Sequence, residues 1–566
     1  MTRIELPPSK KVGHLTLLRE SRPLSIKEFN LLQPDERLDI IRLAQGRQKH
    51  ELLVTAKDGA ELLPRLPAQE VYLLVKELGI DDVADLVPMA SPEQFAAFLD
   101  LDGWQADELQ EAALVPWLAA LLDGGEDVVL QAVANLDYEL LALWLGKLAK
   151  HVEGPEDDQE EQSRENSYRI EFHDSEQGKV LSALLDVLQR REPEFYCRLL
   201  EGVRSESRAV LEEESYTFRN GRMQDLGFPD PIAALEVFSY LPPQSFCASD
   251  HSKAGVLWGA GEESVAPGFV LTTARPRAML AEVLNADLPA EIAWELTYLL
   301  NKVLLANRVE VGDLRQVEAG LQEVFNYVNL ALEHLAGDDV DKAVEFFSTI
   351  YLQSLFQLGF SLTVDLQRRA KQLNSSSIGP YLDGPFRALV TALDRRRPQF
   401  YVGLEEETRG DERPFARQRD LNIAEQWLDR LELQRRLFEE VFPFRLPAPE
   451  AMDLQGCQPD AAEDLTLSEF FLTALANRLL GEVFLPTPLA RDLLGELHSL
   501  ICVDGELSPE LRRETLQWLE EQCPGSSGFG EFCLDVWAEE FCSVEQAQLD
   551  PRYVGGLIIR MDKNRD

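Results

Sequence analysis

Apolar residues recur three and four positions apart over most of the chain, the spacing that places them on one face of a helix. The signal is clearest between about Leu62 and Val152, where it predicts short helices in succession. Their apolar faces are formed by Val71, Leu74, Val75 and Leu78; by Val83, Leu86 and Val87; by Phe95, Phe98 and Leu99; by Trp117, Leu118, Leu121 and Leu122; and by Leu140, Leu141, Trp144, Leu145 and Leu148. No helix this short buries its own apolar face, so we expect neighbours to stack as in a helical solenoid.

Capping residues mark where several of these helices begin and end. Ser25 and Glu28 have capping-box spacing, in which each side chain accepts a hydrogen bond from a backbone N–H of the first turn. Ser91 followed by Pro92 is a typical helix start, and Gly79 suits the position after a helix end.

The uncharged stretch Phe346–Val364 is long enough to raise the question of a membrane span. It is too polar for one, because it contains Ser348, Thr349, Gln353, Ser354, Gln357, Ser361 and Thr363. We therefore expect a helix buried on most sides and no membrane insertion.

These patterns predict an all-α protein of several parts. The expected parts are an N-terminal arm (1–24), a helical-repeat region (25–152), an acidic linker (153–166), a first helical module (167–380) and a second helical module with a C-terminal tail (381–566).

The two modules share short sequence matches in the same order. The matched groups are Leu184, Leu185, Leu188, Arg190, Arg191, Pro193, Phe195, Tyr196 and Leu199 with Leu389, Val390, Leu393, Arg395, Arg396, Pro398, Phe400, Tyr401 and Leu404; Arg222, Asp225 and Leu226 with Arg417, Asp420 and Leu421; Glu236, Val237, Phe238 and Tyr240 with Glu440, Val441, Phe442 and Phe444; and Leu305, Ala306, Asn307 and Arg308 with Leu475, Ala476, Asn477 and Arg478. The shared order favours a tandem duplication. The alternative is that helix ends and core positions simply repeat common patterns.

The chain is strongly acidic, with 99 Asp and Glu against 55 Lys and Arg, a net charge of −44. Such a surface repels nucleic-acid phosphates and anionic lipids. It suits plain solubility, a basic protein partner or divalent cations.

The seven cysteines are spread over a long chain, so we expect no disulfide framework. The first residues, Met1 to Pro8, are not followed by the apolar run of a secretory signal. Both observations favour a cytoplasmic protein.

The segment from Leu66-Pro67-Ala68 to Ser91-Pro92-Glu93 resembles the cytoplasmic helical repeats of MgtE-type magnesium transporters. It also resembles the helical repeats of flagellar motor switch proteins. The resemblance implies short packed helices. Since no membrane domain follows, transport does not carry over, and only a magnesium-responsive regulator remains as a hypothesis.

The chain as a whole resembles a bacterial family of unknown function. The residues that carry this resemblance are Asp100-Leu101-Asp102-x-Trp104-x-x-Asp107, the stretch from Phe218 to Asp230, and Leu472-Thr473-Ala474-Leu475-Ala476-Asn477-Arg478-Leu479-Leu480-Gly481. The resemblance implies a helical bacterial cytosolic protein and no known activity.

Motifs that carry catalysis or cofactor binding are largely missing: the sequence has no GxxxxGK, HExxH, CxxC or GxSxG pattern. Asp100, Asp102, Asp107 and Glu111 superficially suggest a calcium loop, but Trp104 occupies a ligand position. We expect Asp102 to cap a helix and Trp104 to pack, and we expect no cofactor and no metal.

Four of the cysteines gather near the C-terminus, close to His498. They are Cys502, Cys523, Cys533 and Cys542. Zinc and iron–sulfur sites usually bring paired cysteines two to four residues apart. We therefore interpret these four as buried thiols.

The duplicated motifs supply eight candidate binding residues: Arg222, Asp225, Asn307, Arg308, Arg417, Asp420, Asn477 and Arg478. The Arg–Asp pairs are spaced to form ion pairs within one helix turn, and the Asn–Arg pairs could bind a carboxylate or phosphate. The alternative for the Asn–Arg pairs is that they cap other helix ends.

Three functions fit these observations. The first is a non-catalytic scaffold or adaptor that binds another protein, with Trp104, Phe228 and Tyr240 as anchors if they are exposed. The second is a ligand-binding protein or enzyme with a cleft between the two modules, lined by the eight residues. The third is the magnesium-responsive regulator.

Overall fold

A computed structural model of the chain describes residues 3–4, 24–154, 168–253, 278–286, 288–289, 291–406, 410–503 and 505–561. Most of them lie in helices, and the strands are short, which confirms the all-α prediction. The chain divides into two compact units, which are described separately below. Unit 1 comprises residues 1–239, 247–325 and 339–356, and unit 2 comprises residues 240–246, 326–338 and 357–566.

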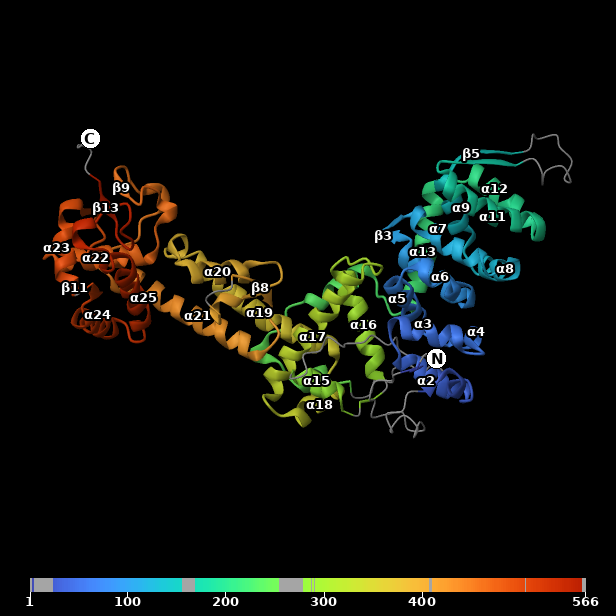
Figure 1. Ribbon diagram of the computed structural model, residues 1–566, viewed down its shortest axis with the longest axis horizontal. Helices are drawn as coiled ribbons and strands as arrows, with labels where there is room; N and C mark the ends of the chain where they lie inside the picture. The colour runs from blue at the N-terminus through green and yellow to red at the C-terminus, as the bar shows by residue number, and fades with distance from the viewer. Residues whose placement is uncertain are drawn as a thin grey trace. The chain divides into compact units, whose positions relative to one another are not determined.

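The helices follow the chain in the order shown in Figure 1. The longer ones are α2 (Pro34–Leu43), α3 (Gly46–Thr55), α5 (Ala68–Leu78), α6 (Pro92–Asp102), α7 (Glu111–Leu122), α8 (Glu126–Ala134), α9 (Tyr138–Leu148), α11 (Ser175–Arg191), α12 (Pro193–Ser205), α13 (Arg208–Asp225), α16 (Glu291–Ala306), α17 (Leu314–Ala336), α18 (Val340–Thr349), α19 (Leu352–Asn374), α20 (Gly384–Asp394), α21 (Gln418–Arg436), α22 (Leu467–Leu479), α23 (Leu494–Ile501), α24 (Pro509–Gln522) and α25 (Ser527–Trp537). The short ones used below are α1 (Ile26–Phe29), α4 (Gly59–Leu62), η3 (Ile80–Asp82), α14 (Pro231–Ala234), η5 (Leu235–Phe238), η7 (Ala248–His251), α15 (Met279–Leu284), η9 (Val402–Leu404), the π-helix η10 (Leu437–Val441) and the π-helix η14 (Ala538–Cys542).

The strands form small separate ladders. They are β1 (Arg3–Ile4) with β2 (Leu24–Ser25), β3 (Trp104–Gln105) with β4 (Glu108–Leu109), β5 (Ala149–Glu153) with β6 (Arg169–Phe172), β7 (Gln399–Tyr401) with β8 (Glu412–Pro414), β11 (Cys502–Val503) with β12 (Glu506–Leu507), and β9 (Cys457–Gln458), β13 (Ile559–Arg560) and β10 (Leu489–Ala490) together.

The capping signals place the N-terminal helices of unit 1 as expected. The Ser25 hydroxyl accepts from the backbone N–H of Glu28, whose carboxylate accepts from Ser25 N at 2.9 Å. Ser91 and Gln94 make the same reciprocal pair at the start of α6. Gly79 ends α5 with a φ of +89°, which a residue with a Cβ adopts only under strain.

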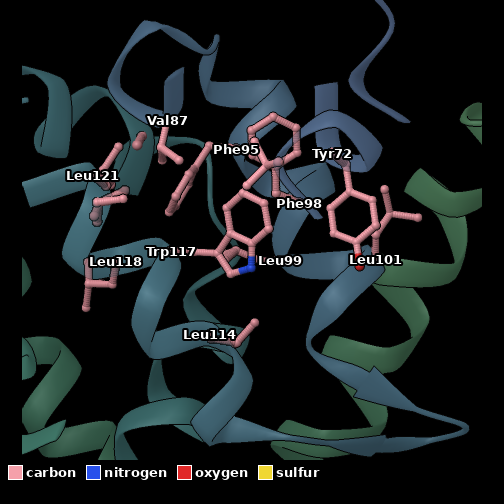
Figure 2. Packing of buried hydrophobic residues seen from close by; sticks show 14 of the residues in the cluster. Tyr72, Val87, Phe95, Phe98, Leu99, Leu101, Leu114, Trp117, Leu118 and Leu121 are labelled. Carbon is pink, nitrogen blue, oxygen red and sulfur yellow. The ribbon is translucent and has the colours of Figure 1, made fainter. Parts of the chain in front are cut away.

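The predicted apolar faces form one buried core in unit 1. Figure 2 shows Trp117 of α7 packed beside Phe98 of α6 and Tyr72 of α5. The Trp117 ring lies 5.1 Å from that of Phe98 and 5.8 Å from that of Tyr72, centroid to centroid, and all three side chains are fully buried. Helices α11 to α13 pack against α6 to α9, which covers the outer apolar residues of these short helices.

The expected acidic linker lies mostly outside the described residues, which resume at Tyr168. The strands on either side of it, β5 and β6, pair antiparallel with each other, and both belong to unit 1. The backbone on both sides of the expected linker is thus held in one ladder of one unit, and the expected division at this segment stays a prediction. The expected arm, 1–24, also lies mostly outside the described residues.

The stretch 346–364 is not one helix. α18 ends at Thr349 and α19 begins at Leu352. Among the described residues no single helix is long and apolar enough to cross a membrane, and α8 with α9 reaches the required length only across a 113° bend.

The core of unit 2 contains a cluster of aromatic side chains. Phe442 stacks on Trp518, with ring planes 12° apart, and contacts Phe444, Phe471 and Phe484. Unit 2 also contains a close approach of two helices: a Cβ built on Gly359 of α19 would lie 1.9 Å from the backbone oxygen of Tyr327 in α17.

Some of the sequence matches between the two expected modules fall on different structures, although Leu305–Arg308 and Leu475–Arg478 both lie at a helix end, of α16 and of α22. Pro193–Leu199 lies in helix α12, whereas Pro398–Leu404 forms β7 and η9. Arg222 and Asp225 lie at the end of α13, but Arg417 and Asp420 lie at the start of α21. These differences fit the alternative of recurring helix-end and core patterns, and the duplication stays a prediction.

Candidate functional site

Arg222 is held inside unit 1 by two carboxylates. Its Nε and Nη2 donate to the two oxygens of Asp100 at 2.6 and 3.0 Å, and its Nη1 donates to Asp137 at 2.5 Å. Asp100 is completely buried, and burial raises its pKa against the opposing effect of Arg222. Arg222 does not pair with Asp225, so the predicted ion pair within one helix turn is wrong here.

The other candidates of unit 1 lie apart from Arg222. Asn307 donates to Glu323 at 2.5 Å and so links the end of α16 to α17. Arg308 is exposed and has a φ of +56°, the left-handed conformation that follows a helix end. Asp225 is exposed on the rim of a pocket described below.

In unit 2, Asp420 binds Arg413, not the predicted Arg417. Both guanidinium nitrogens of Arg413 donate to Asp420 at 2.8 Å, and the backbone N–H of Ala416 donates at 2.9 Å. Burial opposes ionisation, but these hydrogen bonds hold the pKa of Asp420 below its usual value. Arg417 contributes its backbone N–H to the same carboxylate.

Asn477 and Arg478 have different roles in unit 2. Asn477 donates to the backbone oxygens of Leu485 and Thr487, both at 2.9 Å, and so fixes the loop after α22. Arg478 is exposed and lies 4.8 Å from the ring centroid of Trp518. Neither contact caps another helix end, so the capping alternative is wrong for this pair, and the binding role stays a prediction.

Unit 1 has an open pocket of about 820 Å³ next to Asp225. Its lining combines Asp35, Leu38, Asp39, Arg42, Pro64, Arg65, Leu66, Pro67, Ala68, Gln69, Asp225, Leu226 and Trp294. Both arginines already have acidic partners: Arg65 binds Asp35 at 2.7 Å, and Arg42 lies 3.5 Å from Asp39.

A second open pocket of unit 1, of about 630 Å³, has a more organised floor; we call it the Asp102 pocket. Its lining consists of Lys76, Gly79, Ile80, Leu101, Asp102, Trp104, Gln105, Gln110, Ala113, Pro116, Trp117, Glu310, Gly312 and Asp313. They come from α5, the end of α6, the β3–β4 hairpin, α7 and the turn before α17.

Three donors converge on Asp102 at the floor of this pocket. Its Oδ1 accepts from the Tyr72 hydroxyl at 2.8 Å and from Lys76 Nζ at 2.7 Å, and its Oδ2 accepts from Trp117 Nε1 at 2.8 Å. Figure 2 shows the Tyr72 hydroxyl and the Trp117 nitrogen at the same edge of the ring stack. Burial and the Asp102 charge raise the pKa of Tyr72, so this hydroxyl stays protonated as a donor.

The turn 310–313 closes one side of the Asp102 pocket. The backbone N–H of Asp313 donates to the oxygen of Glu310 at 2.9 Å. A Cβ on Gly312 would lie 2.9 Å from both Asp102 Oδ1 and the Tyr72 hydroxyl, so only glycine fits this turn against the floor.

Sequence reasoning noticed part of this floor but misjudged its role. Asp102 is the last residue of α6 and does not cap a helix through its side chain; it collects donors from α5 and α7. Trp104 packs as expected and is 7% exposed. The sequence did contain one signal for this floor: Tyr72 and Lys76 lie one helix turn apart on α5, so their side chains can reach the same acceptor.

Of the three expected anchors, Phe228 is buried. Tyr240 is half-buried, and its hydroxyl donates to Asp365. Large apolar residues that are exposed instead include Ile232, Leu235 and Tyr298.

The C-terminal cysteines are not four thiols. Cys502 and Cys542 form a disulfide with Cα atoms 5.5 Å apart, whereas Cys523 and Cys533 are buried and reduced. Among the described residues, no group of three or more His, Cys, Asp or Glu side chains is placed to hold a metal ion.

A serine and a histidine of unit 1 lie within hydrogen-bonding distance of each other. Ser354 Oγ lies 3.1 Å from His251 Nδ1, and the His251 backbone oxygen accepts from Tyr351 N. In hydrolase triads the serine contacts Nε2 and an acid orients Nδ1. Here the contact tethers η7 to the start of α19, which is a structural role.

A family model described as a family of unknown function (DUF6178) matches residues 26–560, so the chain belongs to that family. No curated protein and no solved structure matches the chain. The comparisons show no relationship to magnesium transporters or to flagellar motor switch proteins.

Proposed function

We propose that this member of the DUF6178 family is a non-catalytic scaffold that binds another protein. The observation that carries the proposal is an exposed apolar face on unit 1. Ile232 of α14 and Leu235 of η5 are 79% and 55% exposed, three residues apart on one side of a helical segment. Both elements pack against α16, whose Tyr298 is 38% exposed. Two strongly exposed apolar side chains on one side of a helical segment suit a protein-interaction surface.

The charges around this face indicate a basic partner. Asp230 precedes Ile232, and Glu236 follows Leu235 with 68% of its side chain exposed. The whole chain carries 44 more acidic than basic groups. An apolar centre with a carboxylate rim attracts a partner that carries apolar residues among lysines or arginines.

Site-specific photo-crosslinking in the producing cells tests this function. A photoreactive residue at 232 or 235 should yield one recurrent crosslinked protein with a basic contact segment. The same residue at Val210, an exposed apolar position on α13, is the control and should not yield that protein. The proposal fails if positions 232, 235 and 210 give the same pattern, or if none of them gives a crosslink.

A further inference from the structure

The Asp102 pocket combines carboxylates with apolar side chains. We infer that it receives a lysine or arginine side chain from the partner protein, as a specific contact within the proposed scaffold function on which this inference rests. The pocket offers two carboxylates that form no ion pair with the described residues, and an apolar wall beside them.

The charge of Asp102 at the floor is already balanced within the protein. Asp102 and Lys76 form an ion pair, and the other donors to Asp102 are neutral. Asp102 therefore supplies a rigid floor rather than a free charge.

The free negative charge lies on the turn 310–313. Neither Glu310 nor Asp313 forms an ion pair with any described residue, and both line the pocket. Glu310 accepts from Gln105 Nε2 at 2.8 Å, which holds its carboxylate in place. The side-chain amide and backbone N–H of Gln316 hold the pKa of Asp313 below its usual value, so this carboxylate is charged at neutral pH.

The rest of the lining suits an aliphatic stem. Ile80, Leu101 and Pro116 provide apolar wall. Trp104 also lines the pocket, and its buried indole N–H has no acceptor in the described part of the chain. The N–H itself is covered by the protein, so Trp104 adds aromatic surface to the wall and offers no donor to a ligand.

This combination selects one ligand class. The two carboxylates repel an anionic ligand, and a bare metal ion would make no use of the apolar wall. A basic side chain places its charge at Glu310 and Asp313 and its methylene groups along the wall.

Fluorine NMR of the full chain labelled with 5-fluorotryptophan tests the inference. The Trp104 and Trp117 signals are assigned from the variants Trp104→Phe and Trp117→Phe. The probes are N-acetyl-arginine methylamide, N-acetyl-lysine methylamide, N-acetyl-norleucine methylamide, spermidine and magnesium chloride, at constant ionic strength.

The two basic amino-acid amides should shift the Trp104 or Trp117 signal saturably, and the norleucine amide should not. The double variant Glu310→Gln/Asp313→Asn should weaken the binding about tenfold, because two exposed ion pairs are lost. Both substitutions keep one acceptor oxygen, for Gln105 Nε2 and for the backbone N–H groups of Arg315 and Gln316; the side-chain hydrogen bond from Gln316 to Asp313 Oδ2 is lost. The matched control Asp107→Asn/Glu108→Gln removes two carboxylates of the β3–β4 turn that do not line the pocket and should bind normally.

Four results would overturn the inference: an equal shift with norleucine amide, a shift with spermidine or magnesium but not with the basic amides, equal weakening in the control variant, or no shift with any probe. The crosslinking at positions 232 and 235 is independent of these residues. Failure here with success there would remove the pocket and leave the scaffold function.

Discussion

Removal of Arg222 should destabilise unit 1 more than its partial exposure suggests. Arg222→Met keeps the aliphatic stem but takes away both guanidinium contacts to Asp100, a carboxylate with no exposed surface. Hydrogen bonds to charged groups contribute about 1.5–3 kcal/mol each. Breaking a buried ion pair by deleting one partner costs about 3–5 kcal/mol, and we expect a loss of that size. Arg219, whose Nε donates to the Asp100 backbone oxygen at 3.0 Å, remains nearby and favours the lower end.

The loss should depend on pH in a defined direction. Burial already raises the folded-state pKa of Asp100, so its contribution to stability is largest below its unfolded value and declines as pH rises. Without Arg222 that pKa rises further. The difference between wild type and Arg222→Met should therefore be greatest at neutral and alkaline pH and should shrink as acid protonates Asp100 in both proteins.

Peptide-resolved hydrogen exchange in increasing urea is the appropriate assay, because a chain of two units need not unfold in one step. Peptides from α6 and α13 report the change. Arg190→Met removes an exposed pair with Glu126 and should leave these peptides unchanged. Arg222→Met/Asp100→Asn should recover part of the loss. A loss below about 1 kcal/mol, as for a surface pair, or the same loss at every pH would refute the reasoning.

Two further changes test the packing of the fold. Gly359→Ala should destabilise unit 2 by about 1–3 kcal/mol or more, because its Cβ would meet the Tyr327 backbone. Gly221→Ala in α13 meets nothing within 4 Å and should stabilise unit 1 by about 0.5–1 kcal/mol. Urea unfolding measures both changes, and effects of the same sign would contradict the assigned contacts. Reduction of the Cys502–Cys542 disulfide, which spans 40 residues, should lower the stability of unit 2 by up to about 4 kcal/mol. In the variant Cys502→Ser, reductant should no longer change the melting temperature. A reductant effect that persists in this variant would show that the effect arises elsewhere.

Local signals predicted local structure well. The helix starts at Ser25 and Ser91 and the end at Gly79 depend on residues a few positions apart, and all three lie where the sequence indicates. The buried faces of the short helices follow from the same helical spacing.

Partner choice over long sequence distances could not be predicted. Arg222 has a carboxylate three residues away, yet it binds Asp100 and Asp137, which lie 122 and 85 residues earlier in the chain. Asp420 shows the same uncertainty at short range: it binds Arg413, seven residues earlier, whose fork geometry reaches both carboxylate oxygens. The repeated Arg–Asp motif was misleading for a related reason. A helix end and a helix start can share the same few residues, so short matches do not distinguish them.

The end of α6 explains why the core network and the Asp102 pocket belong together. Asp100 and Asp102 are two residues apart, so their side chains leave the helix roughly 200° from each other. Asp100 binds Arg222 of α13, while Asp102 binds Tyr72 and Lys76 of α5 and Trp117 of α7. The last turn of this one helix therefore fixes α13 on one side and the pocket floor on the other. A change that releases Asp100 from Arg222 frees that turn and loosens the geometry of Asp102, even though Arg222 does not line the pocket.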